Sequence, residues 1–202
     1  MKQNKIKFIY FDVGGVIVNW RIGVDKFAKQ YQKKLTHVFS TFNKYDSDFC
    51  RGLYPAKKIN EIFRKEYKIK DKLFDFHDYV INRFVPIKEV HDLIKDLDTE
   101  YRLGLLTNLH PGSYQMTALK NHLPKINFEI VIQSCEVGFI KPEKEIYLLA
   151  REKAGVKHEE ILFIDDIKIN VEEAAKLGWN VVHFDENNAK SSVSQIRRIL
   201  SM

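Results

Sequence analysis

The sequence is poor in the features that mark secreted and membrane-spanning proteins. Its 202 residues include two cysteines and five prolines, and no apolar run is long enough to span a bilayer. Cys50 and Cys135 cannot supply a disulfide framework, and their spacing is not that of a metal motif, so we expect free thiols. Residues 1–5, MKQNK, lead into an apolar segment without the pattern of a signal peptide. These absences predict a cytoplasmic protein with no membrane partner.

Several motifs that assign a function directly are also missing. The sequence has neither a Walker motif nor a dinucleotide-binding GxGxxG motif, so Gly14 and Gly15 do not form a nucleotide loop. No two of its seven histidines have H-x-x-x-H spacing, and for all but His110 we expect roles at the surface or in the helical segment described below. The net charge of +6 comes from lysines mixed with acidic and apolar residues, as on solvated helix faces. We therefore expect no nucleic-acid partner.

The residues that are present are typical of a globular α/β protein. Hydrophobic residues make up 45% of the chain and charged residues 30%, which suits one sizeable core with or without an inserted module. Short apolar runs predict strands, and the segments between them carry apolar residues at helical spacing. The strands are expected at 6–11, 101–106, 129–132, 160–164 and 180–184. This alternation predicts a parallel sheet with helices on both faces.

One long segment, residues 20–84, contains no convincing strand. Its apolar residues recur at helical spacing, and we expect breaks between helices at 45–48 and 51–55. Such helices form either a small inserted domain or a layer that covers the sheet. We expect an inserted helical domain, with the bounds 19–85, and an α/β core formed by 1–18 and 86–202.

Two prolines and a glycine indicate where later helices begin and end. Pro86 is expected to open a helix, and Pro142 suits the first turn of another. Gly155 is expected to end that second helix, because glycine readily adopts the left-handed backbone found there. Both helices are therefore assigned to the layers that cover the sheet.

Polar residues follow three of the predicted strands directly. Asp12 follows the first strand, Thr107 and Asn108 follow the second, and Asp165 and Asp166 follow the fourth. A lone aspartate in this place most often caps a turn. However, the carboxyl ends of parallel strands meet at one edge of a sheet, where α/β proteins gather their ligands. Three such ends predict one shared site.

The chemistry of these side chains is complementary. Carboxylates from two strands and a backbone carbonyl form the incomplete oxygen shell that Mg²⁺ favours. The Thr107 hydroxyl, the Asn108 amide and the Lys141 ammonium can donate hydrogen bonds to a phosphate. Asp12 can then attack phosphorus and form an aspartyl phosphate, which water hydrolyses. The pattern predicts a hydrolase for a small phosphorylated substrate.

These residues also carry a family resemblance that covers nearly the whole chain. Asp12 in FDVGGV, Thr107 in LLTN, Lys141 in IKPE and Asp165-Asp166 in FIDD resemble, in this order, the four motifs of the haloacid dehalogenase (HAD) superfamily. The resemblance implies a Rossmann-like, three-layer core with a parallel sheet. It also implies a helical cap domain inserted between the first two motifs.

The same resemblance implies a role for each site residue. Asp12 would be the nucleophile and would also bind Mg²⁺. Gly14 would bind the metal through its backbone carbonyl, and Asp166 would bind it directly. Asp165 would bind a metal-bound water or orient the site, with Asn170 supporting the metal from the following helix.

One position departs from the pattern of the family's phosphatases. Those enzymes usually carry a second aspartate two residues after the nucleophile, where it protonates the leaving group, and this chain has Gly14 there. A general acid–base group typically contributes about 10²- to 10⁴-fold to the rate, so its loss predicts slow turnover. The metal-binding backbone carbonyl is retained.

Three functions are compatible with this departure. The first is a phosphatase for substrates with good leaving groups, since the motifs resemble those of glucose-1-phosphatase-like sugar-phosphate phosphatases, in which this glycine occurs. The second is a 2-haloacid dehalogenase, whose halide needs no proton, although those enzymes usually carry tyrosine in this place. The third is a catalytically impaired binding or regulatory protein.

Two further residues are candidates for the site. His110, on the loop after the second strand, could replace the missing proton donor, or it could simply contact solvent or the cap. Trp20, directly after the first motif, could contact the substrate or belong to the helix core. The expected assembly is a monomer or a weak homodimer.

Overall fold

The computed structural model describes residues 6–202 of the chain. Residues 1–5 lie outside the described part. The expected absence of a signal peptide and the first five residues of the predicted core therefore concern residues beyond this description.

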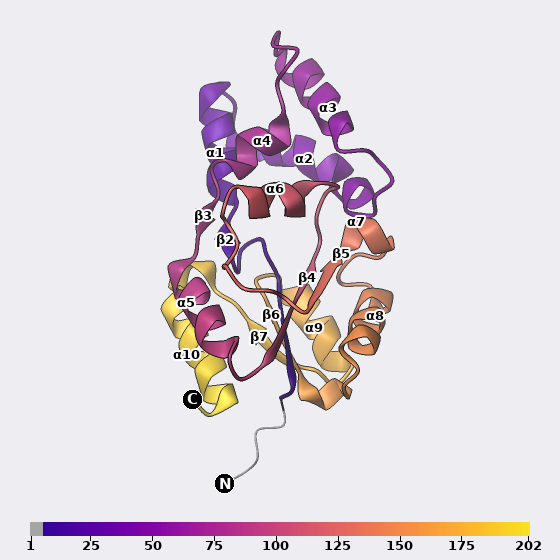
Figure 1. Ribbon diagram of the computed structural model, residues 1–202. Helices are drawn as coiled ribbons and strands as arrows, with labels where there is room; N and C mark the ends of the chain where they lie inside the picture. Colours follow the sequence, from indigo (N-terminus) through magenta and orange to yellow (C-terminus); the bar gives the residue numbers. More distant parts are fainter. Residues whose placement is uncertain (1–5) are drawn as a thin grey trace.

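Within residues 6–202, five strands form one parallel sheet in the order β5-β4-β1-β6-β7 (Figure 1). The central strand β1 pairs with β4 on one side and with β6 on the other, so that Phe11 lies between Leu105 and Ile164. The bounds of the strands are β1 Phe8–Phe11, β4 Arg102–Thr107, β5 Ile130–Gln133, β6 Ile161–Asp165 and β7 Asn180–His183. The predicted α/β fold with a parallel, Rossmann-like sheet is confirmed.

Both faces of the sheet are buried beneath helices. Ile9 and Phe11 pack with helices α5 and α10, while Phe8 and Tyr10 pack with α8 and α9 on the opposite face. Alternate residues of a strand point to opposite faces, so β1 must be apolar throughout to fill both layers. The bounds of these helices are α5 Lys88–Leu97, α8 Lys144–Ala154, α9 Lys168–Lys176 and α10 Ala189–Leu200.

Four helices between β1 and β4 have a hydrophobic cluster of their own. It contains many aromatic residues, among them Phe27, Phe63 and Phe76, and the rings of Phe63 and Phe76 have centroids 3.7 Å apart. The helices are α1 Arg21–Gln30, α2 Leu35–Cys50, α3 Lys57–Tyr67 and α4 Phe76–Ile81. They lie beyond the carboxyl end of the sheet, above α6 (Figure 1).

A short antiparallel pair connects these helices to the sheet. Strand β2, Val18–Asn19, pairs with β3, Val85–Pro86. The prediction that Pro86 opens a helix is therefore wrong. Pro86 is extended and pairs with Val18, and α5 begins at Lys88.

One predicted helix break is also wrong. Helix α2 continues through residues 45–48, where the aromatic ring of Tyr45 packs against the helical cluster and Asp46 contacts His110. These tertiary contacts outweigh the low helix propensity of the Asp and Ser residues there. The break expected at 51–55 is confirmed, because α2 ends at Cys50 and α3 begins at Lys57.

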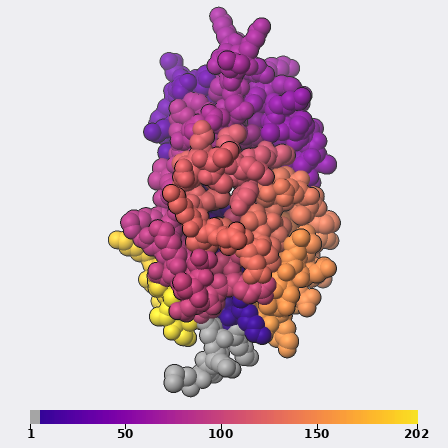
Figure 2. All heavy atoms as spheres, viewed as in Figure 1, coloured from indigo at the N-terminus to yellow at the C-terminus, as the bar shows by residue number. Residues whose placement is uncertain are grey.

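The predicted end of helix α8 is confirmed and its predicted start is not. It ends at Gly155 in the left-handed conformation, but it begins at Lys144, so Pro142 lies before its first turn. The segment between β4 and β5, which carries α6, covers the middle of the face shown in Figure 2. The short helices are α6 Ser113–Leu119, α7 Ser134–Val137, η1 His158–Glu160 and η2 Glu186–Asn188. No helix in residues 6–202 is long and apolar enough to cross a membrane.

Candidate active site

The polar residues at the strand ends meet at one edge of the sheet. Asp12 follows β1, Thr107 ends β4, Asp165 ends β6 and Asp166 follows it. Carboxylate oxygens from the three aspartates all lie within 4.8 Å of one another. Asp12 and Asp166 line a cavity of about 350 Å³, whose other wall is formed by the inserted helices. Three predicted site residues from two strands thus form one cluster.

Lys141 supplies the positive charge inside this cluster. Its side chain is fully buried, and its Nζ lies 2.6 Å from Asp165 Oδ2 and 3.1 Å from Asp12 Oδ1. Nζ also donates a hydrogen bond of 2.8 Å to the Leu106 carbonyl oxygen. Burial works against the charged ammonium, but the carboxylates of Asp12 and Asp165 outweigh it and raise the pKa of Lys141. Lys141 therefore stays protonated and holds both aspartates.

Asn108 holds the backbone of Lys141 in place. Its Nδ2 donates to the Lys141 carbonyl oxygen over 2.9 Å, and its Oδ1 accepts from the Lys141 N–H over 2.9 Å. The Asn108 amide thus positions Lys141, and its predicted contact with phosphate stays a prediction. The loop before α8 is thereby fastened to the end of β4.

Asp12 has an environment that suits a nucleophile. Its Oδ1 accepts hydrogen bonds from the Val13 N–H over 2.7 Å and contacts Lys141 Nζ, which leaves Oδ2 for reaction. Burial raises the pKa of Asp12 to about 7, Lys141 opposes that rise, and Asp165 and Asp166 add to it. The site therefore carries more negative charge than Lys141 compensates.

The two neighbouring aspartates differ in how fully they are hydrogen-bonded. Asp165 accepts from the Ile167 N–H over 2.7 Å, from Asn170 Nδ2 over 3.1 Å at both oxygens, and from Lys141. Within residues 6–202, the Asp166 carboxylate has one ion-pair partner, Arg21, whose Nη2 lies 3.5 Å from Oδ2. Burial and the nearby Asp165 raise the pKa of Asp166 to about 6. The Asp166 carboxylate therefore has fewer hydrogen-bond partners than that of Asp165, and the predicted roles of Asp165, Asp166 and Asn170 at a metal stay predictions.

Gly15 allows Asp166 to approach the nucleophile loop. Its φ is +79°, and a Cβ at this position would lie 2.3 Å from the Asp166 carboxyl carbon. A side chain would therefore both strain the backbone and displace the carboxylate.

The residues present fit a hard divalent cation. The metal-ligand atoms are carboxylate oxygens, and two of the three carboxyl groups have a raised pKa, chiefly because they are buried and also because other carboxylates lie nearby. The Thr107 hydroxyl oxygen is also buried; no hydrogen bond of standard geometry reaches it within residues 6–202, although it lies near enough to Asp12 to lower the pKa of that carboxyl. A bound cation would balance the charge of the carboxylates, and an anionic ligand on that cation could accept a hydrogen bond from Thr107. The role of the Gly14 carbonyl stays a prediction.

Trp20 occupies the space beside Gly14. A Cβ built at Gly14 would lie 3.1 Å from Trp20 Cδ1 and 3.3 Å from Nε1. The indole is held there by Phe39 and Phe42, whose ring centroids are 5.8 and 5.9 Å away. Trp20 lines the cavity and fills the direction in which an acid–base side chain at position 14 would project.

His110 lines the same cavity, but both of its ring nitrogens are engaged. Nε2 lies 2.8 Å from Asp46 Oδ1, and Nδ1 lies 2.9 Å from His77 Nε2. The ring also stacks on Phe42 and Phe49, with centroids 5.1 and 4.8 Å away. Its delivery of a proton to a leaving group would require one of the two nitrogen contacts to break.

Sequence reasoning missed four residues around this cavity. Asp46 and Cys50 are one turn apart on α2, a spacing that was hidden by the predicted break at 45–48. His77 was expected at the surface or in the helical segment, and it is buried there at the cavity wall. Arg21 bridges Asp166 and Glu186, at 3.5 and 3.0 Å, and no local pattern marks it.

Comparison with known proteins places these observations in a family. The model described as haloacid dehalogenase-like hydrolase matches residues 9–184. Among curated proteins, the chain is 26% identical over 99 residues to acyl-CoA dehydrogenase family member 10 of Mus musculus, covering 48% of this chain and 9% of that protein. It is 32% identical over 73 residues to bifunctional epoxide hydrolase 2 of Mus musculus, covering 36% and 13%. The chain thus matches a small part of the length of either relative.

Solved structures share the fold over most of their length. A variant of a HAD family enzyme from Bacteroides thetaiotaomicron, solved with magnesium and inorganic phosphate, is 25% identical with a TM-score of 0.70, over 87% of this chain and 92% of that one. A HAD-like hydrolase from Porphyromonas gingivalis is 24% identical with a TM-score of 0.70, over 96% and 98%. The L-2-haloacid dehalogenase of Xanthobacter autotrophicus, with chloropropionic acid covalently bound, is 19% identical with a TM-score of 0.69, over 89% and 77%.

Proposed function

Because the chain belongs to the haloacid dehalogenase-like hydrolase family, we propose that it is a Mg²⁺-dependent phosphatase for a small phosphorylated metabolite, such as a sugar phosphate. The observation that carries this proposal is the excess negative charge at the strand ends. Asp12, Asp165 and Asp166 gather there around a single buried ammonium, that of Lys141. Asp12 and Asp166 would hold Mg²⁺, which when bound neutralises the repulsion between the anionic nucleophile and the anionic substrate.

The side chains of the site then have distinct tasks. Asp12 Oδ2 forms a bond to phosphorus while the bond from phosphorus to the leaving-group oxygen breaks, and this oxygen takes up a proton. Water next attacks the phosphorus of the aspartyl phosphate, which releases inorganic phosphate and restores Asp12. The buried Thr107 hydroxyl donates a hydrogen bond to a phosphate oxygen, and Lys141 keeps Asp12 oriented.

The glycine at position 14 limits which substrates react quickly. No carboxyl group stands there to protonate the leaving oxygen, and Trp20 fills the adjacent space. Esters whose leaving group is a weak base, such as an anomeric phosphate, need this proton less than simple alkyl phosphates do. The proposal therefore favours substrates with good leaving groups.

A second candidate function rests on the same position and on the aromatic cavity wall. A halide leaves without a proton, so a 2-haloacid dehalogenase does not need a carboxyl group at Gly14. Asp12 would form an ester with the carbon that carries the halogen, and water would then hydrolyse this ester. Trp20, Phe39 and Phe42 give the cavity an apolar side that suits such a substrate.

One experiment separates these functions. The purified chain is assayed with p-nitrophenyl phosphate and a panel of sugar phosphates, with and without Mg²⁺, and in parallel with 2-chloropropionate. Phosphate release that needs Mg²⁺ and is lost in Asp12→Asn supports the phosphatase. The exposed Asp98→Asn is the matched control and keeps full activity.

Other outcomes overturn the proposal. Chloride release without added metal identifies the dehalogenase. If neither phosphate nor chloride appears with any substrate, the chain is an impaired member of the family that acts by binding.

A further inference from the structure

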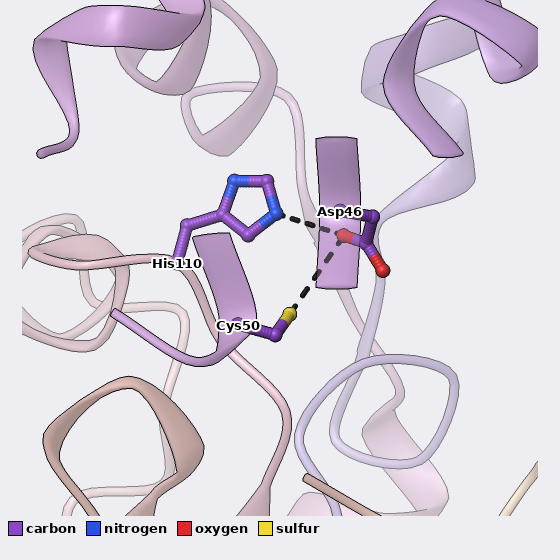
Figure 3. A group of neighbouring side chains, drawn as sticks. All are labelled: Asp46, Cys50 and His110. Carbon is purple, nitrogen blue, oxygen red and sulfur yellow. Dashed lines mark hydrogen bonds and ion pairs between the residues drawn. The ribbon is translucent and has the colours of Figure 1, made fainter. Parts of the chain in front are cut away.

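A second cluster of metal-ligating side chains lies in the same cavity, and the proposed reaction does not use it. Asp46 and Cys50 come from adjacent turns of α2, and His110 comes from the loop after β4 (Figure 3). One ligand atom from each residue lies within 4.8 Å of the other two. The cluster therefore joins an inserted helix to the α/β core.

The three side chains converge on one carboxylate oxygen. His110 Nε2 lies 2.8 Å from Asp46 Oδ1, and the Cys50 thiol donates to the same oxygen over 3.7 Å (Figure 3). The His110 nitrogen, the Cys50 sulfur and the Asp46 oxygen thus point at one small volume. Hydrogen bonds to the Asp46 oxygen now join these three atoms. A metal ion could take the place of the protons in these hydrogen bonds.

His77 provides the partner that metal-bound histidines usually have. Its Nε2 lies 2.9 Å from His110 Nδ1, on the far side of the ring from Asp46. The His77 ring is buried at the cavity wall. A neutral imidazole can accept the proton of His110 Nδ1–H, which leaves the Nε2 lone pair of His110 for a metal.

We propose that Asp46, Cys50 and His110 bind a thiophilic divalent metal ion such as Zn²⁺, at a site separate from the strand-end aspartates. Sulfur, nitrogen and carboxylate ligands suit Zn²⁺ and not Mg²⁺, whereas the strand-end cluster offers only oxygen. Three protein ligands leave one tetrahedral position, which opens to the shared cavity and can hold water.

Binding requires a defined loss of protons. The Cys50 thiol gives one proton to solvent and becomes a thiolate that bonds to the metal. The His110–His77 pair keeps both of its protons and only changes tautomer. Because a thiol must lose its proton before it binds a metal, affinity rises with pH. No electron is transferred.

The site would act as a bridge across the cavity. Asp46 and Cys50 move with α2, and His110 moves with the loop at the end of β4. An ion bound to all three ties these two walls together and so resists their separation. The proposal does not depend on the proposed phosphatase activity, since it concerns binding alone.

Cobalt provides a direct test, because a thiolate bound to Co²⁺ produces an intense charge-transfer absorption that oxygen ligands do not. The metal-free full chain is titrated with Co²⁺ in excess Mg²⁺, and Zn²⁺ is then added. We expect one Co²⁺ per chain with the sulfur band, release of one proton, and loss of the band on addition of Zn²⁺.

Variants assign the band to the cluster. Cys50→Ser should abolish the band, and His110→Ala should weaken Zn²⁺ binding at least tenfold, a loss of about 1.4 kcal/mol or more. Cys135→Ser removes the other free thiol and should leave binding unchanged. Asp12→Asn alters only the strand-end cluster and should also keep the band.

The proposal fails if the native chain gives no sulfur band, if the band survives Cys50→Ser, or if excess Mg²⁺ displaces the ion. His77→Phe tests the role of His77 separately from the loss of a ligand, because Asp46, Cys50 and His110 are all retained. It should weaken binding while the sulfur band persists at saturating Co²⁺, and unchanged affinity would remove His77 from the site.

Discussion

Two clusters of potential metal ligands line one cavity, and they are built in different ways. In the strand-end cluster, Asp12, Asp165 and Asp166 are placed by β1 and β6, two adjacent parallel strands. In the α2 cluster, Asp46, Cys50 and His110 are brought together by packing a helix against a loop. Sheet topology alone brings the first set together, whereas the second depends on tertiary contacts.

The clusters also differ in how their charge is balanced. The three carboxylates of the strand-end cluster share one buried ammonium, and the pKa of Asp12 and that of Asp166 are both raised. The α2 cluster has one carboxylate, which a thiol and an imidazole can satisfy with hydrogen bonds. A bound cation would therefore favour the ionised form of the first cluster, while the carboxylate of the second already has hydrogen-bond partners.

Removal of the nucleophile should have the largest effect and tests whether the two clusters are independent. Asp12→Asn should lower phosphatase kcat by about 10³-fold or more, since a catalytic nucleophile has no substitute in the site. The thiolate–Co²⁺ band of the α2 cluster should persist. Steady-state kinetics and absorption spectra measure the two effects, and loss of both would show that the clusters are not independent.

A carboxylate at position 14 should raise the catalytic rate of the strand-end cluster. Gly14→Asp should raise kcat on an alkyl phosphate by about 10²-fold, with a smaller gain on p-nitrophenyl phosphate, because the added acid protonates the leaving oxygen. Trp20 must move by a few tenths of an ångström to admit the Cβ alone, and further to admit the carboxyl group. Gly14→Asn has the same shape without the acid and should give no gain, so equal rates for both variants would contradict the explanation.

The buried imidazole of His77 should make stability depend on pH. Its folded pKa of about 3 lies below the ordinary 6.5, so the unfolded chain binds a proton first, and stability is lost as pH falls below 6.5. From pH 7 to pH 5 the native chain should lose about 2 kcal/mol more than His77→Gln. Urea unfolding at both pH values measures this difference, with the exposed His183→Gln as control. Equal pH slopes in all three chains would mean that His77 is protonated in the fold.

The smallest expected effect concerns Arg21. Its guanidinium is half exposed and lies 3.5 Å from Asp166, where it competes with a cation. Arg21→Ala should therefore tighten Mg²⁺ binding about twofold to fivefold, while Zn²⁺ affinity at Cys50 stays unchanged. Calorimetric titration gives both affinities, and Lys29→Ala, which removes a surface pair with Asp25, is the matched control. Weaker Mg²⁺ binding in Arg21→Ala would contradict this competition.

The same division explains what could be predicted from the sequence. The end of a strand is visible in a few consecutive residues, so an apolar run followed by Asp12 or by Asp165 predicts the site from the sequence. The α2 cluster needs Asp46 to be helical, and its local sequence, Tyr45 to Asp48, favours a break. Contacts with His110 and the aromatic cluster decide otherwise, and such long-range packing leaves no local pattern.

Arg21 and Trp20 were hard to interpret for a related reason. Both follow the first motif closely, yet their positions depend on the direction in which α1 leaves the nucleophile loop, because Trp20 precedes α1 and Arg21 is its first residue. The short β2–β3 pair that sets this direction has two residues in each strand, which is too few to produce a periodic pattern.

The two adjacent glycines after Asp12 have opposite capacities for change. Gly15 has a left-handed backbone and lies against the Asp166 carboxyl, so almost any replacement would dismantle the site. Gly14 has no such constraint on its backbone, and only an indole ring stands in its way. Residue 14 is thus a position at which a descendant of this chain could gain an acid by one substitution, with a shift of Trp20 and no change in the backbone. An essential residue and an evolvable one are joined by a single peptide bond.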